Sequence, residues 1–188
     1  MSHVPSLVEL RGVAARLGST TILRDVDFTL EPGQAVGLFG ANGAGKTMLS
    51  EAMLHVAGVT TRLGRVEEGT TTSDYEPEEQ RRNTSIQTSV MPYQWKEHKV
   101  NVIDTPGYAD YRGEVISGMR VADGAVIVVA ASSGVEVGTQ EMWQMAESRK
   151  LPRIIFVNKA DRENADFQRV MDSLVEKFGR RCVAIQVP

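Results

Sequence analysis

The chain has 188 residues, enough for one compact domain, and its 41% hydrophobic and 24% charged residues are typical of a globular protein. A net charge of −3 argues against coating of nucleic acid through charge, and we expect no DNA partner. No apolar run of about 18 residues occurs and the start lacks signal-peptide character, so we expect no membrane contact and a cytoplasmic location.

Two strands are predicted near the start of the chain, over residues 7–14 and 21–30. Apolar and polar residues alternate in both, and Gly18-Ser19 supplies a turn between them. Glu31-Pro32-Gly33 is a second turn, which leads into a short apolar strand over 35–39. We therefore expect an antiparallel hairpin that packs on the core.

The next segment, from Gly40 to Thr47, fits the phosphate-binding pattern G-x-x-x-x-G-K-[ST]. A helical pattern follows, and its apolar face comprises Met48, Leu49, Ala52, Met53 and Val56. At such a strand-to-helix turn, backbone N–H groups and the helix N-terminus surround a phosphate. Lys46 is placed to reach the β and γ phosphates, and Thr47 to offer its hydroxyl to magnesium. The expected phosphate-binding residues are Ala41, Asn42, Gly43, Ala44, Gly45, Lys46, Thr47 and Met48.

A long stretch without periodicity follows, from residue 59 to 84, after a helix expected to end near Gly58. It is longer than the usual connection between elements. One interpretation is a solvated linker, and the other is a loop that orders around a γ phosphate. The position directly after the phosphate-loop helix favours the second.

Strands are predicted over 85–95 and 100–103, joined by a tight connection at His98-Lys99. The second strand leads into Asp104-Thr105-Pro106-Gly107. Asp104 has the place of an acidic residue that holds magnesium-bound water, although a turn or helix cap is the alternative. The apolar strand before it favours magnesium. Gly107 has no side chain, so its N–H is able to reach a γ phosphate.

Helices and strands alternate in the remainder of the chain, which predicts parallel strands with right-handed crossovers. The expected elements are helices at 113–122, 139–150 and 167–178 and strands at 125–131, 154–157 and 182–187. The predicted fold is α/β. It is one three-layer P-loop NTPase domain over 1–188, with a mostly parallel sheet, helices on both faces and the N-terminal antiparallel hairpin.

Asn158-Lys159-Ala160-Asp161 follows one of these strands and indicates guanine recognition. The Asp161 carboxylate is suited to accept N1–H and the exocyclic amine of guanine. Adenine has an acceptor at N1 and no amine at C2, so it leaves that carboxylate unpaired. Asn158 is placed to hold the loop, and the stem of Lys159 to lie along the ring.

From about Met48 to Pro188 the chain resembles the GTP-binding domain of bacterial elongation factor G, in particular its divergent second type. The matching segments are 64–72, 104–107 and 158–161. The resemblance implies GTP hydrolysis that is stimulated by the ribosome during translocation. Ribosome binding is implied by the family alone and is not expected for so short a chain.

The first 45 or so residues resemble the start of an ATP-binding cassette ATPase. The matching segments are 7–13, 22–28, 32–33 and 40–47. We therefore expect a chimera, engineered or recombined, with 1–47 from the cassette lineage and 48–188 from the translational GTPase lineage. The adenine-stacking aromatic of the cassette family aligns with Leu17, and the signature Leu-Ser-Gly-Gly-Gln is absent, so cassette-type ATP hydrolysis is not expected.

The elongation-factor resemblance also assigns roles at positions where the chain departs from that family. The γ-phosphate-sensing Thr aligns with Ser85, so the expected magnesium residues are Thr47, Ser85 and Asp104. The water-positioning His aligns with Tyr108, and a phenol is a poor base near neutral pH. The expected catalytic residues are Lys46, Gly107 and Tyr108.

The favoured function is binding of GTP and GDP with Mg²⁺, with at most slow intrinsic GTP hydrolysis. One alternative is an ATP- or ADP-binding domain governed by the cassette-like half. The other is a folded scaffold with little nucleotide binding.

Overall fold

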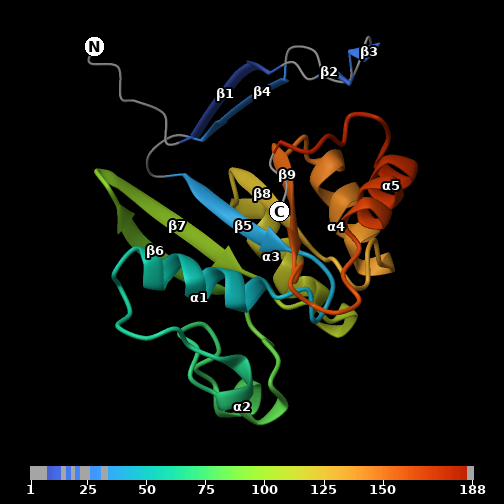
Figure 1. The fold of residues 1–188 in the computed structure, drawn as a ribbon. Helices are drawn as coiled ribbons and strands as arrows, with labels where there is room; N and C mark the ends of the chain where they lie inside the picture. Colours follow the sequence, from blue (N-terminus) through green and yellow to red (C-terminus); the bar gives the residue numbers. More distant parts are fainter. Residues whose placement is uncertain (1–7, 14–15, 18–19, 22–25, 31–33, 186–188) are drawn as a thin grey trace.

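The computed structural model describes residues 8–13, 16–17, 20–21, 26–30 and 34–185, and its centre is a five-stranded sheet. The sheet has the order β6-β7-β5-β8-β9 (Figure 1). Its strands are β5 (Ala35–Phe39), β6 (Ser89–Trp95), β7 (His98–Asp104), β8 (Gly124–Ala130) and β9 (Arg153–Asn158). β5 runs parallel to β7 and β8, β9 runs parallel to β8, and β6 is antiparallel to β7. The expected mostly parallel sheet is confirmed.

Helices cover both faces of this sheet, which confirms the three layers (Figure 1). The helices are α1 (Lys46–Val56), α3 (Arg112–Val121), α4 (Val137–Ser148) and α5 (Phe167–Phe178). Side chains of β8 point alternately to the two faces, so Val126 and Val128 pack with Leu54 of α1. On the other face Ala125 packs among residues of α3 and α4, and Ile127 packs with α5. All of β8 is buried, as its continuous apolar run predicts.

The described part of the N-terminal segment contains two short antiparallel pairs. β1 (Val8–Val13) pairs with β4 (Val26–Leu30), and β2 (Arg16–Leu17) pairs with β3 (Thr20–Thr21). The antiparallel pairing expected for the hairpin is therefore confirmed. The expected turns at 18–19 and 31–33 lie outside the described residues, and the expected packing on the core stays a prediction.

The stretch from 59 to 84, expected to lack regular structure, contains the short helix α2 (Pro77–Arg82) and one 3₁₀ turn, η1 (Val66–Glu68). Pro77 stands in the first turn, where a missing N–H costs nothing. The Glu79 carboxylate accepts the N–H of Glu76 at 3.2 Å, and Asn83 ends the helix with a φ of 51°. The lack of periodicity in the sequence therefore hid a short helix, which these capping residues favour.

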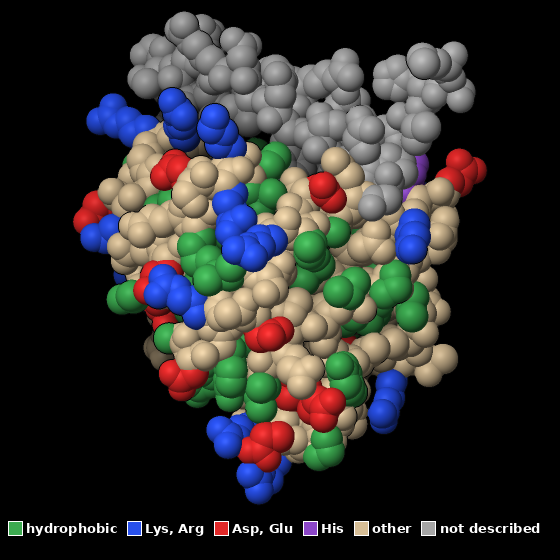
Figure 2. Space-filling model, turned by 180° about the vertical axis from the view of Figure 1, so that it is seen from behind, with side chains coloured by type: hydrophobic (Ala, Val, Ile, Leu, Met, Phe, Trp, Pro, Cys, Tyr) green, Lys and Arg blue, Asp and Glu red, His purple; other side chains and the backbone are tan. Residues whose placement is uncertain are grey.

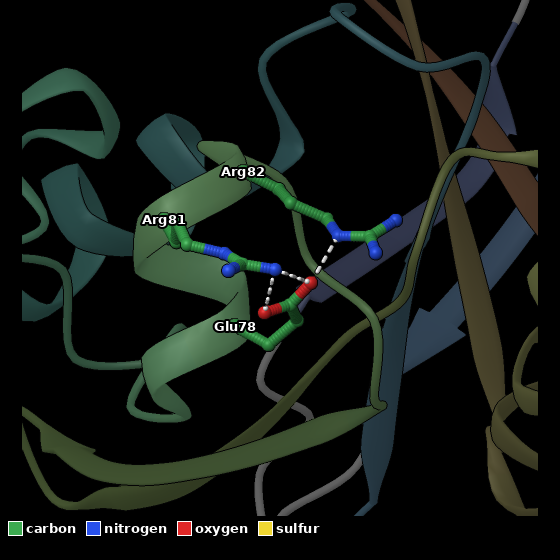
Figure 3. A network of polar contacts seen from close by, with 3 residues as sticks. All are labelled: Glu78, Arg81 and Arg82. Carbon is green, nitrogen blue, oxygen red and sulfur yellow. Dashed lines mark hydrogen bonds and ion pairs between the residues drawn. The ribbon is translucent and has the colours of Figure 1, made fainter.

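Glu78 of α2 forms ion pairs with two arginines of the same helix, Arg81 and Arg82 (Figure 3). Hydrogen bonds from Arg81 and Arg82 lower the pKa of the Glu78 carboxyl. The three side chains lie at the surface, where ion pairs contribute little to folding stability. The buried carboxylate of Glu79 ties α2 to the rest of the domain more firmly, because it also accepts the N–H groups of Ile86 and Gln87, at 2.9 and 3.1 Å.

Other expected boundaries also need correction. The strand expected over 85–95 begins at Ser89, and the tight turn lies at 96–97 instead of 98–99, because Trp95 pairs with His98. Residues 182–185 form no strand, and the rest of that expected strand lies outside the described residues. Val56, expected in the apolar face of α1, is 69% exposed at the last turn.

Positive and negative side chains are interspersed on the face opposite that of Figure 1 (Figure 2). This face shows no broad basic surface, in line with the net charge of −3. In the part of the chain that the structure describes, none of the helices is both long and apolar enough to cross a bilayer.

Candidate functional site

The loop between β5 and α1 is a glycine-dependent turn that lies against the start of the 158–161 segment. Gly40, Gly43 and Gly45 have φ values of 148°, 76° and 92°, a region that L side chains rarely adopt. A Cβ on Gly45 would also collide with the side-chain amide of Asn158. Glycine at 45 is therefore required both for the left-handed backbone and for close contact with β9.

The ammonium group of Lys46 lies inside this loop. Its Nζ donates to the carbonyl oxygens of Gly40 and Ala41, at 3.0 and 3.1 Å, and the side chain is 6% exposed. Burial lowers the pKa of Lys46, against the opposing charges of Asp104 and Glu136. A Cβ on Gly107 would lie 2.8 Å from Nζ of Lys46 and 2.7 Å from the backbone nitrogen of Asn42. The backbone at 107 is thus directly beside the loop.

Thr47, Ser85 and Asp104, the expected magnesium residues, come together in one cluster. The Thr47 hydroxyl donates to Oδ2 of Asp104 at 2.8 Å, and its oxygen lies 3.1 Å from Oγ of Ser85. The register of the sheet explains this, because Asp104 at the end of β7 is the partner of Leu38 in β5. The strand next to β5 therefore carries the acidic residue to the loop.

The geometry of this cluster fits a magnesium ion. Adjacent ligands of an octahedral Mg²⁺, each about 2.1 Å from the metal, are about 3 Å apart, and the Thr47 and Ser85 oxygens are 3.1 Å apart. Oδ1 of Asp104 is buried and has no hydrogen-bond partner among the described residues. Two hydroxyls and a carboxylate are hard oxygen ligands of the kind that magnesium binds.

Protons and Mg²⁺ are expected to compete for Asp104. Burial raises the pKa of this carboxyl to about 6, against the opposing charge of Lys46. Because the metal needs the ionised form, we expect a constant Mg²⁺ affinity above about pH 7 and a roughly ten-fold loss per pH unit below about 6. By the same linkage, the metal-free fold loses stability as the pH rises from about 4 to 6.

Mg²⁺ titrations of the protein with a fluorescent GDP analogue, between about pH 5 and 8, test this pH dependence. The variant Asp172→Asn is the control, because it removes an exposed carboxylate from α5. An Mg²⁺ affinity that stays the same down to pH 5 would contradict a raised pKa at Asp104.

Asn158 and Lys159, expected to serve guanine, both contact the phosphate loop. The Asn158 amide donates to the carbonyl oxygen of Ala44 at 3.0 Å, and Nζ of Lys159 donates to that of Gly43 at 2.7 Å. Lys159 has a φ of 60°, and its N–H is held by the side-chain oxygen of Asn158 at 2.8 Å. Asp161 lies in the turn that follows, with its carboxylate exposed and without a polar partner among the described residues. A base bound there would lie next to the phosphate loop.

The remaining expected site residues are more exposed. Tyr108 is 48% exposed, directly before the 3₁₀ turn η2 (Ala109–Tyr111). Asn42 is also exposed, and Met48 is half-buried in the first turn of α1. Tyr108 directly follows Gly107 in the chain, and its phenol forms no hydrogen bond with the described residues.

Two buried carboxylates that tie the 59–84 segment to the site were missed by sequence reasoning. Glu51 of α1 accepts the N–H of Thr72, and Asp74 accepts the Ser85 hydroxyl at 2.7 Å. Glu51 was detectable, because it lies four residues after Thr47 on one helical face. Asp74 had no such signal, since only the path of the loop brings it to Ser85.

Comparisons with known proteins identify the family and relatives of this chain. The family model described as "Elongation factor Tu GTP binding domain" matches residues 32–186. The chain is 41% identical over 153 residues to a mitochondrial ribosome-releasing factor 2 of Candida albicans, covering 81% of this chain and 19% of that protein. It is 38% identical over 160 residues to elongation factor G of Granulibacter bethesdensis, covering 85% and 23%.

A crystal structure of a protein from Thermus thermophilus superposes with a TM-score of 0.75 and 42% identity, over 78% of this chain and 22% of that one. The chain thus spans about a fifth of the length of the relatives it matches.

Proposed function

Because the chain belongs to the family of the elongation factor Tu GTP binding domain, we propose that it binds GTP and GDP together with Mg²⁺. The observation that carries this proposal is the meeting of three motifs at one loop. The phosphate loop is hydrogen-bonded to Asp104 through Thr47 and to the 158–161 segment through Asn158. Nucleotides bind at the carboxyl ends of strands in such open sheets, and β5, β7 and β9 end there.

The phosphates bind to backbone N–H groups of residues 41–48, at the N-terminus of α1. Lys46 turns its ammonium from the loop carbonyls to the β and γ phosphates, and the N–H of Gly107 points to the γ phosphate. Thr47, Ser85 and Asp104 hold the metal, whose charge offsets that of the phosphate oxygens. Lys46 has little distance to move, because it is already inside the loop.

The guanine base binds between the Lys159 stem and the turn that carries Asp161. The open carboxylate of Asp161 accepts the two N–H groups on the edge of the base, and Asn158 keeps this turn against the phosphate loop. Adenine is rejected because it leaves the carboxylate without those donors.

Intrinsic GTP hydrolysis is expected to be slow. Turnover in this class depends on positioning and charge, and without an added arginine it falls to about 10⁻⁴ per second. Lys46 and Gly107 supply groups for the γ phosphate, but Tyr108 is able at best to orient water. Its exposed side chain supports this limited role.

The origin of the first part of the chain and the wider role of the protein are further proposals. The family match covers residues 32–186 and so includes the phosphate loop, which leaves only residues 1–31, with the pair β1–β4, outside it. The proposal of a chimera whose residues 1–47 derive from a cassette ATPase rests on the sequence resemblance alone. A role in translation, with the ribosome as partner, rests on the names of the relatives. A cytoplasmic location also remains a proposal, because the Candida relative is named mitochondrial.

Competitive binding of fluorescent GDP and ADP analogues with Mg²⁺ tests the proposed function. We expect GDP to bind at least about 100-fold more tightly, because the base edge is read by a charged acceptor. Equal affinity would favour the ATP- or ADP-binding alternative and contradict guanine recognition. Absence of binding to either nucleotide would leave only the scaffold.

A further inference from the structure

Four polar side chains form a continuous row beside the phosphate loop, in which Asp74, Thr47 and Asp104 are buried and Ser85 is half-buried. Asp74 accepts the Ser85 hydroxyl at 2.7 Å, Ser85 lies 3.1 Å from the Thr47 oxygen, and Thr47 donates to Asp104 at 2.8 Å. Each end of the row has one buried carboxylate oxygen, Oδ2 of Asp74 and Oδ1 of Asp104, without a partner among the described residues. The row therefore joins the expected metal residues to a carboxylate that has no assigned role.

The hydroxyl protons of this row point away from its centre. Each hydroxyl has one proton, and the carboxylates can only accept when ionised. Ser85 uses its proton on Asp74, and Thr47 uses its proton on Asp104. No proton is then left for the 3.1 Å contact between the two hydroxyl oxygens, which face each other with lone pairs. This is the arrangement that a cation, and not a hydrogen bond, satisfies.

The burial of Asp74 is unfavourable in the protein without metal. The residue is 3% exposed, and no ion pair to it occurs in the described part of the chain. The buried carboxylates of Glu79 and Glu51 add like charge near it. A carboxylate kept among other carboxylates without a cation weakens the fold, so its presence calls for a role other than stability.

We propose that Asp74 is a positioning residue of the magnesium site. Its carboxylate accepts a hydrogen bond from the Ser85 hydroxyl, and this hydrogen bond turns the Ser85 lone pairs toward the metal beside Thr47. This inference rests on the proposed function and deepens its metal site. The inference also explains how the 59–84 segment is coupled to the site. Asp74 lies in the middle of that segment, and Ser85 is the first residue after its end.

The test measures Mn²⁺ affinity by electron paramagnetic resonance, with a non-hydrolysable imido analogue of GTP bound. Asp74→Ala removes the acceptor, and we expect Mn²⁺ to bind about ten-fold more weakly, the loss typical of one hydrogen bond to a charged group. Asp74→Asn keeps an acceptor oxygen and is expected to recover part of the affinity. Asp172→Asn controls for net charge and is expected to bind Mn²⁺ as the unmodified chain does.

Two further measurements separate positioning from a structural role. Without metal, both Asp74 variants are expected to melt at the same or a higher temperature than the unmodified chain, because a buried unpaired charge is removed. In a Ser85→Ala background, Asp74→Ala is expected to change Mn²⁺ affinity by less than about two-fold, because it acts through Ser85.

Several results would overturn the inference. One is an unchanged Mn²⁺ affinity in Asp74→Ala. Another is that both Asp74 variants melt at a lower temperature without metal but keep the Mn²⁺ affinity of the unmodified chain. A ten-fold loss of Mn²⁺ affinity on adding Asp74→Ala to Ser85→Ala would also overturn it, because Asp74 would then act independently of Ser85. If the unmodified chain bound neither nucleotide nor Mn²⁺, the proposed function itself would fail, which is a distinct result.

Discussion

Replacement of Asp161 by Asn is expected to turn the protein from guanine to xanthine nucleotides. The carboxylate is exposed and unpartnered among the described residues, so it is available to accept both N–H groups of guanine. An amide offers one acceptor and one donor, and the donor opposes the guanine amine but matches the C2 carbonyl of xanthine. The amide oxygen still accepts N1–H, but one hydrogen bond to a charged group is lost and two donors then face each other. Together these changes cost about 3–4 kcal/mol, so we expect GDP affinity to fall by ~10²–10³-fold.

Fluorescent GDP and XDP analogues, titrated in parallel against both proteins, measure this exchange. Asp166→Asn is a matched control, because Asp166 follows in the same region but uses its carboxylate to cap α5 through the N–H of Arg169, at 2.9 Å. It is expected to affect stability and leave the GDP-to-XDP ratio unchanged. An Asp161→Asn protein that still prefers GDP would place the base elsewhere.

The phosphate loop and the residues around it are predictable from sequence because their chemistry is local. Gly45, Lys46 and Thr47 lie in one short motif, and the left-handed backbone of Gly45 and the burial of Lys46 follow from it. Asp104 and Asn158 were placed at strand ends, and a parallel sheet brings such ends together at one edge. Their roles toward a nucleotide remain predictions.

The 59–84 segment was less predictable, because long-range contacts decide its structure. Glu79 and Asp74 are held by N–H and hydroxyl groups that approach only when the chain folds back. The strand expected from the apolar residues after Cys182 illustrates the same limit. Strand formation needs a neighbouring strand as partner, and none pairs with 182–185 among the described residues.

Replacement of Lys46 by Met is expected to be as damaging to nucleotide affinity as the change at Asp161, but through the phosphates. Met keeps an apolar stem of similar length and removes the ammonium. Loss of a buried, charge-assisted contact to two phosphates is worth about 3 kcal/mol or more, so GDP affinity falls at least ~100-fold. The fold is expected to survive, because the buried ammonium is itself costly and its loss offsets the two hydrogen bonds to loop carbonyls.

Lys159→Met is the matched control, because Lys159 also donates to a carbonyl of the phosphate loop but lies on the base side. This variant is expected to lower GDP affinity by less than about ten-fold, since Met keeps the apolar stem that covers the base. The two main variants also predict a pattern that neither predicts alone. Lys46→Met lowers the affinities for GDP and XDP by the same factor with either residue at 161. Asp161→Asn instead lowers the affinity for GDP and shifts the GDP-to-XDP ratio, because base and phosphate contacts are separate and their free energies add. If Lys46→Met bound GDP within about three-fold of the unmodified chain, the loop would not be the phosphate site, whatever the result at Asp161.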